Sequence, residues 1–228
     1  MKYVWIYIGA IALIDAIAGV VFVSAPSDGL VRGYFVSEDS LIENLTASFY
    51  LLTCLFALVL LNIRSTRTMR GRKALMLFSV FGLIAFLEEL SYGERLFDIE
   101  MPVLSGMKID AVHDFFSLGL DLTLSLAAVN QLLIFLGFLT VLVLSAAAIF
   151  MYGKRHWEAA VAHQFYPAYL MALFFVVLII FSLIIDTGLF EFPGFRALEE
   201  CLELNAALAL LMSCFLTYKL GADRLPRS

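Results

Sequence analysis

The chain has 228 residues, of which 62% are hydrophobic and 15% are charged, with a mean hydropathy of +0.95 and a net charge of −5. A soluble domain is usually about 45–50% apolar and about 25% charged, so this composition excludes an ordinary globular core in water. No basic patch or phosphate-binding glycine loop supports nucleic-acid binding or nucleotide chemistry. We therefore expect an all-α polytopic membrane helix bundle with the lipid bilayer as its solvent and no nucleic-acid partner.

Six apolar runs are long enough to cross the hydrocarbon core, which takes about 20 residues at 1.5 Å per residue. Pro26 directly follows the small-residue stretch at the end of the first run, so we interpret that run as a retained span rather than a cleaved signal peptide. Residues 93–123 are expected to form an external segment with a short interfacial helix. The chain is thus predicted to be one transmembrane domain, 1–228, with spans at 3–24, 41–63, 74–92, 124–152, 165–185 and 198–220.

The basic residues predict how these six spans are oriented. Residues 64–73 hold five of the fifteen Lys and Arg, and eleven of the fifteen fall on the same side as this loop. Cytoplasmic loops carry an excess of Lys and Arg, so both termini are predicted to lie inside. Seventeen of the twenty acidic residues then fall in external loops or at the outer ends of spans.

Asp15 lies within the first predicted span. A carboxylate at membrane depth is a functional-site hypothesis by default. It could hydrogen-bond a neighbouring helix, carry a proton, or relay protons toward the outer acids. Asn130 and Gln131 of the fourth span are the candidate partners.

The third and sixth spans carry acids at their outer ends. Glu88 and Glu89 fall at the C-terminal end of a helix, where the helix dipole disfavours an anion, and they follow an apolar run. Glu203 is more than one turn into its helix, between two leucines. These three need protons, a cation or arginine partners. Glu200 and Glu199 lie nearer their helix start, where the dipole and capping favour an acid.

Arg95 supplies a structural alternative for the third span. Glu88, Tyr92 and Arg95 share one helix face, with Glu94 beside them, so the guanidinium could neutralise neighbouring carboxylates in an ion network. Arg95, even together with Arg196, is too little charge for all the acids predicted at this face. Protons or a divalent cation would complete the balance.

The external segment carries a second acidic set. Asp110, Asp114, Ser117 and Asp121 follow a helical spacing that places them on one stripe, with His113 beside it. His113 is either a hydrogen-bonded structural residue or a ligand or proton carrier. A metal set of Glu88, Glu89, His113 and Glu203 would suit Zn, Mn or Fe, whereas an all-oxygen set would suit Ca or Mg.

The run from Glu88 to Phe97 reads Glu-Glu-Leu-Ser-Tyr-Gly-Glu-Arg-Leu-Phe, and His113-Asp114 follows it. It resembles uncharacterised bacterial multi-pass membrane proteins with a Glu-Glu-[Ile/Leu]-Ser-[Trp/Tyr]-Gly-[Gln/Glu]-Arg run and a later His-[Asn/Asp]. The resemblance implies a bacterial inner (plasma) membrane and no particular activity. The seven-span zinc amidohydrolases of the ceramidase type differ, because their sites use several histidines.

Three functions fit this pattern. The first is a metal-dependent enzyme that acts on a lipid-like or amphiphilic substrate at a site opening to the external, periplasmic face, with Glu88, Glu89, His113 and Asp114 as catalytic residues. The second is a proton- or cation-coupled transporter or channel component that uses Asp15 and the outer acids. The third is a structural or assembly subunit that docks a membrane-protein partner or a second copy of itself. The sequence ranks the enzyme narrowly first.

Overall fold

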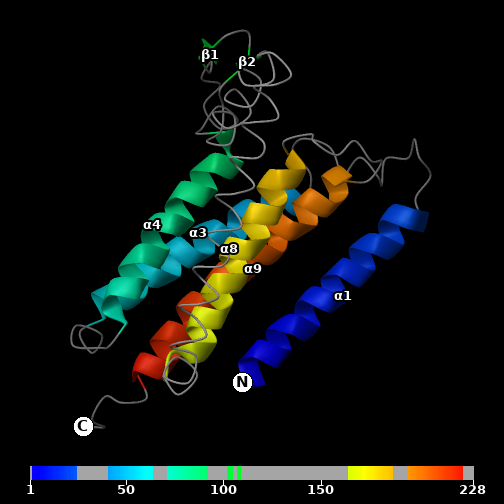
Figure 1. The fold of residues 1–228 in the computed structure, drawn as a ribbon. Coiled ribbons are helices and arrows are strands. Elements are labelled where there is room, and N and C mark those ends of the chain that lie inside the picture. Colours follow the sequence, from blue (N-terminus) through cyan, green and yellow to red (C-terminus); the bar gives the residue numbers. More distant parts are fainter. Residues whose placement is uncertain are drawn as a thin grey trace, which may run out of the picture. The chain divides into compact units, whose positions relative to one another are not determined.

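The computed structural model describes residues 2–24, 41–63, 71–91, 102–104, 107–108, 164–186 and 195–222. The chain divides into two compact units, one formed by Met1–Ile99 with Pro167–Ser228 and the other by Glu100–Tyr166. The described helices belong to the first unit, α8 from its second residue onward (Figure 1). They are α1 (Lys2–Ser24), α3 (Leu41–Asn62), α4 (Arg72–Glu89), α8 (Tyr166–Asp186) and α9 (Phe195–Ala222).

In the second unit the structure describes a short hairpin. Strand β1 (Val103–Leu104) pairs antiparallel with β2 (Met107–Lys108), with Val103 opposite Lys108 and Leu104 opposite Met107. The sequence gives no signal for these strands, because two residues are too few to display an alternating pattern. The interfacial helix expected around residues 110–121 lies outside the described residues.

The all-α class is confirmed for the described chain, apart from that hairpin. Three helices are long and apolar enough to cross a membrane, over Leu41–Asn62, Tyr166–Ile185 and Ala197–Ala222, and Val4–Ile17 is a shorter apolar stretch. The predicted spans 3–24 and 74–92 correspond to α1 and α4, although α4 carries two charged residues at each end. The predicted fourth span, 124–152, lies outside the described residues, so the count of six stays a prediction.

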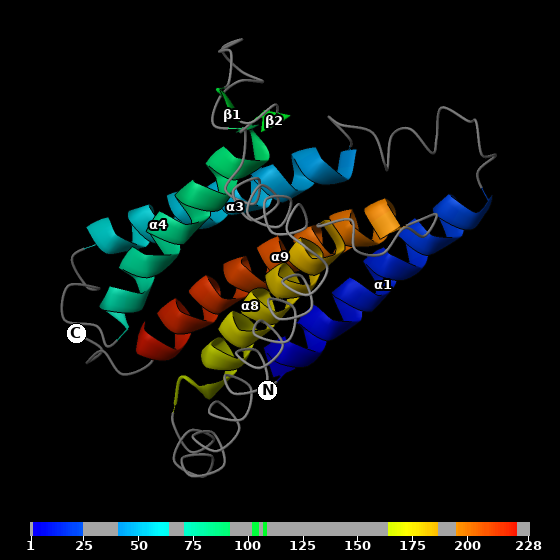
Figure 2. The ribbon, with the colours of Figure 1, turned by 45° about the horizontal axis from the view of Figure 1, so that its top comes forward.

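Helices α3 and α4 run antiparallel and pack more extensively against each other than any other pair, and α3 also packs against α9 (Figure 2). The unit therefore has two distinct ends. We call one the basic end, because the described cations at the start of α4 and the last turn of α9 lie there, and the other the acidic end, because α4 finishes there with two glutamates. The residues concerned are Arg72, Lys73 and Lys219 at the basic end and Glu88 and Glu89 at the acidic end.

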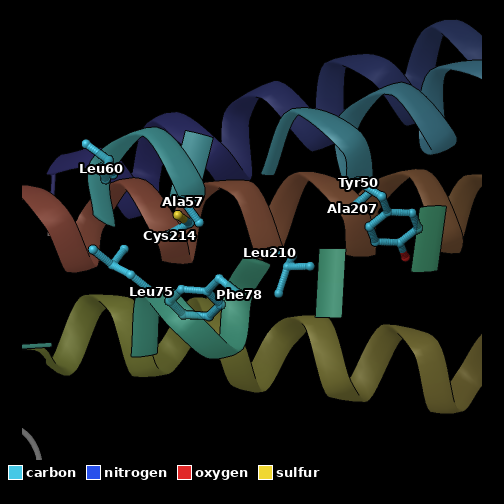
Figure 3. Close-up of a cluster of buried hydrophobic side chains, with 8 residues drawn as sticks. All are labelled: Tyr50, Ala57, Leu60, Leu75, Phe78, Ala207, Leu210 and Cys214. Carbon is cyan, nitrogen blue, oxygen red and sulfur yellow. The ribbon is translucent and has the colours of Figure 1, made fainter. Parts of the chain in front are cut away.

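Small residues let α3, α4 and α9 pack closely between these two ends. Ala57 and Ala207 are fully buried, and the Tyr50 ring lies beside Ala207 (Figure 3). Gly82 of α4 brings the helices nearest, since a Cβ atom there would lie 2.9 Å from the Tyr50 carbonyl oxygen and 3.0 Å from the Cys54 backbone nitrogen. The buried apolar cluster consists of Tyr50, Ala57, Leu60, Leu75, Phe78, Ala207, Leu210 and Cys214.

A second apolar cluster joins α1, α8 and α9. Its buried members are Val4, Tyr7, Ala168, Met171, Ala209 and Leu216. The outward side of α8 is apolar and exposed, including Leu173, Ile180 and Phe181. An exposed apolar face of this length is unfavourable in water and favourable in lipid, so it agrees with a helix that contacts a bilayer.

Ser213 ties α9 to α8 within this second cluster. Its hydroxyl is fully buried and donates a 2.8 Å hydrogen bond to the Ala168 carbonyl oxygen. We expect Ser213→Ala to destabilise the folded protein by about 1 kcal/mol, the usual net worth of such a bond between membrane helices. Thermal unfolding in detergent micelles measures this loss. Ser48→Ala is the matched control, because exposed Ser48 bonds only to Asn44 of its own helix, and an equal loss in both variants would contradict the assignment.

Candidate functional site

Five glutamates from three helices gather at the acidic end of the helical unit. Glu89 of α4 interacts electrostatically with four others, and Glu203 of α9 is the strongest of these neighbours. The predicted third and sixth spans therefore meet at their acidic ends, which the sequence could not establish. We call this group the carboxylate cluster, and its members are Glu43, Glu88, Glu89, Glu200 and Glu203.

The end of α4 fixes two members of the carboxylate cluster. The sequence predicted a helix through residue 92, but α4 ends at Glu89, and Ser91 adopts a left-handed backbone with φ of 47°. Such a conformation stops an α-helix, because it turns the chain away from the helix axis. Glu88 and Glu89 consequently occupy the last turn, where the helix dipole adds to their mutual repulsion.

Glu200 differs from what its position suggested. Helix α9 begins at Phe195, three residues before the predicted start, so Glu200 belongs to the second turn rather than the first. Its side chain is only 9% exposed. Glu200 is therefore not a solvated acid at the helix start. It belongs with the buried part of the carboxylate cluster.

Ser182 of α8 joins the carboxylate cluster from a fourth helix. Its buried hydroxyl donates a 2.8 Å hydrogen bond to Oε1 of Glu203. Tyr50 of α3, 1% exposed, interacts electrostatically with Glu89, Glu203 and Glu88. Sequence reasoning missed both residues, because a single serine or tyrosine in an apolar run carries no pattern of its own.

A second polar centre joins α1 to α9. The Nδ2 group of Asn205 donates to both carboxylate oxygens of Asp15, at 3.0 and 3.2 Å. The Tyr7 hydroxyl donates a 2.9 Å hydrogen bond to the backbone carbonyl oxygen of Asn205. The predicted partners of Asp15, Asn130 and Gln131, lie outside the described residues. Asn205 was missed, although an asparagine two residues after Glu203 in an apolar span was a usable signal.

Cys201 of α9 is close to both polar centres. Its thiol interacts electrostatically with Asp15 and with Glu200. Because Cys201 and Asn205 are four residues apart, both lie on the same face of α9. One helix therefore carries polar groups from the carboxylate cluster to the Asp15 centre.

The described Lys and Arg side chains lie away from the carboxylate cluster, and Arg196 belongs to the first turn of α9. Among the side chains that the structure describes, the Lys and Arg residues are Arg72, Lys73 and Lys219, all at the basic end, and Arg72 donates a 3.2 Å hydrogen bond to the Leu61 carbonyl oxygen there. About 17 residues of helix, or about 25 Å, separate Arg72 from Glu89. This distance is too great for direct neutralisation.

The described residues do not support the predicted metal site. Among them, no group of three or more His, Cys, Asp and Glu side chains is arranged to hold a metal ion. The other predicted site residues lie outside the described part of the chain, so a site that includes them stays a prediction. These residues are Tyr92, Glu94, Arg95, His113, Asp114 and Asp121.

The fold and the site together define an α-helical protein with membrane-compatible helices and a partly buried carboxylate cluster. Comparisons of the chain with protein-family models, with curated proteins and with solved structures gave no match.

Proposed function

We propose that this protein is an integral membrane protein that binds protons or small cations at the carboxylate cluster and conducts them through its helices toward the other side of the membrane. The main support for this function is that Glu89 interacts with four further carboxylates, so that the group comes from three helices. The described side chains of Arg72, Lys73 and Lys219 lie at the opposite end of α4 and α9, while Arg196 belongs to the first turn of α9. A site of this composition is suited to positively charged ions.

The physical reason is the cost of grouping like charges away from water. Charged carboxylates that are close together in a partly buried site repel one another. Uptake of protons or a cation therefore lowers the free energy of the site. Ionisable residues at membrane depth commonly mark proton and ion pathways. The Ser182 hydroxyl, which bonds Glu203, holds one carboxylate in a fixed position.

The membrane arrangement that goes with this function has six spans and both termini inside. It follows from the apolar runs and from the excess of Lys and Arg on one side. The carboxylate cluster would then open to the external face of a bacterial inner membrane, where protons and cations are available. The lipid bilayer would surround the helices in this arrangement.

The metal-dependent enzyme depends on different residues. It needs His113 and Asp114 beside the glutamates, with a bound divalent ion to activate water. Both lie outside the described residues. The ion-passage function rests instead on contacts that the described helices make, and we therefore rank it ahead of the enzyme and of an assembly role.

Ion flux into proteoliposomes tests the proposed function. Purified protein is reconstituted into liposomes with a trapped pH dye, and proton entry is followed under a potassium diffusion potential, with sodium and calcium indicators in parallel. We expect Glu89→Gln to reduce the flux at least tenfold, because it removes the carboxylate that the other four surround. Infrared spectroscopy of the protonated carboxyl band reports, separately, whether the carboxylate cluster binds protons.

Glu199→Gln is the matched control for Glu89→Gln. Glu199 is half-buried and adjacent to Glu200, but it is not among the residues that act on Glu89. Its substitution should leave the flux within about twofold. Wild-type liposomes that conduct no more than empty ones, or a Glu89→Gln variant with full flux, would contradict the proposed function.

A further inference from the structure

The centre formed by Asp15 and Asn205 contains a buried acceptor that calls for a hydrogen-bond donor. Asn205 is 4% exposed, and its Oδ1 atom accepts no hydrogen bond from the described part of the chain. Its Nδ2 atom, in contrast, bonds both oxygens of Asp15. Buried amide oxygens are rarely left without a donor, and water is the usual one where the protein supplies none.

Both helices place this centre at the same depth. Asp15 lies nine residues before the end of α1 at Ser24, which is about 14 Å along the helix axis. Asn205 lies ten residues after the start of α9 at Phe195, about 15 Å from that end. The hydrocarbon core is about 30 Å thick, so each count places the centre near the middle of a bilayer that the helices would cross.

The carboxylate cluster leads toward this depth along α9. Glu200 and Glu203 lie about 8 and 12 Å from the start of the helix by the same rise per residue. Cys201 lies about 9 Å from the start of α9, level with the carboxylate cluster, and one turn before Asn205 on the same face of the helix. The polar groups thus follow one another from the acidic end to mid-membrane.

We infer that Asp15, Asn205 and a water molecule bound at Asn205 Oδ1 form an inner proton-transfer site that receives protons from the carboxylate cluster through the region of Glu200 and Cys201. This inference rests on the proposed function and deepens it, because it names the ion and the next step of its path. The water at Asn205 Oδ1 takes up a proton that has come from the carboxylate cluster and gives a different proton to the Asp15 carboxylate. One O–H bond breaks and one forms at each step, and no redox partner is needed.

The donor set at Asp15 favours protons over metal cations. Ca²⁺ and Mg²⁺ take about six or more oxygen ligands. Here the NH2 group of Asn205 donates to both oxygens of Asp15, an otherwise exposed side chain of α1, and directs partial positive charge at them. An asparagine side chain holds both a donor and an acceptor, so it can serve Asp15 in either protonation state.

Proton flux through Asp15→Asn and Asn205→Leu proteins tests this site in the same liposomes. Asp15→Asn removes the proton acceptor with almost no change of shape, and Asn205→Leu removes the amide that holds the water. We expect each to reduce proton flux at least tenfold while the protonated carboxyl band of the carboxylate cluster persists. Asp15→Asn decides the result if Asn205→Leu does not fold.

Ser213→Ala is the control for packing, because it removes another buried interhelical bond of α9 away from this path. It should keep flux within about twofold of wild type. Full flux in Asp15→Asn, with flux lost in Glu89→Gln, would overturn the inner site and leave the proposed function standing. An absence of flux in the wild type would overturn the proposed function itself.

Discussion

Gly82→Leu should destabilise the folded protein by about 3 kcal/mol, because α3 and α4 could no longer approach each other. The first side-chain carbon would already meet the Tyr50 carbonyl oxygen at 2.9 Å and the Cys54 nitrogen at 3.0 Å. Both are backbone atoms of a helix, so they cannot move aside without shifting α3. Small residues at helix interfaces in membranes serve such close approach.

Thermal unfolding in detergent micelles, followed by circular dichroism, measures this effect. Gly9→Ala is the matched control, because a Cβ atom at Gly9 of α1 would meet nothing within 4 Å. Alanine is the better helix former by about 1 kcal/mol, so this variant should be as stable as wild type or more stable. A Gly82→Leu protein that unfolds at the wild-type temperature would show that the helices do not pack at Gly82.

Glu89→Lys should abolish proton flux and at the same time stabilise the acidic end of the helical unit. The lysine would place a positive charge among the four carboxylates that surround this position. We expect a gain of about 1 kcal/mol, which raises the Tm by about 2–4 °C for a protein of this size. Loss of function with a gain in stability is the result expected when like charges are held together for ion binding.

Arg72→Glu is a charge-reversal control at the basic end, where the Arg72 side chain bonds the Leu61 carbonyl oxygen. Arg72→Glu should lower the Tm, because it removes this hydrogen bond and brings no opposite charges together. If Glu89→Lys also lowered the Tm, the carboxylates would already have cationic partners. Arg95, six residues after Glu89 in the sequence, would then be the first candidate, and the double variant Glu89→Lys, Arg95→Gln would recover stability.

The sequence by itself determined the helices and their class. The five described helices begin and end within three residues of the predicted spans, because the transfer of apolar side chains into lipid depends on the local run of residues and not on their partners. It also singled out Glu88, Glu89, Glu203 and Asp15, because a charge within an apolar run is expensive wherever the helix packs.

Only the tertiary structure decided which of these charges belong together. The sequence offered Asn130 and Gln131 as partners for Asp15, whereas the described partner is Asn205, and it treated Glu200 as a helix-start residue, whereas its side chain is buried in the carboxylate cluster. Apolar helices can pack in many arrangements with similar burial of their surfaces. The contacts at Gly82, Ser213 and Ser182 select one arrangement, and through it the neighbours of each carboxylate.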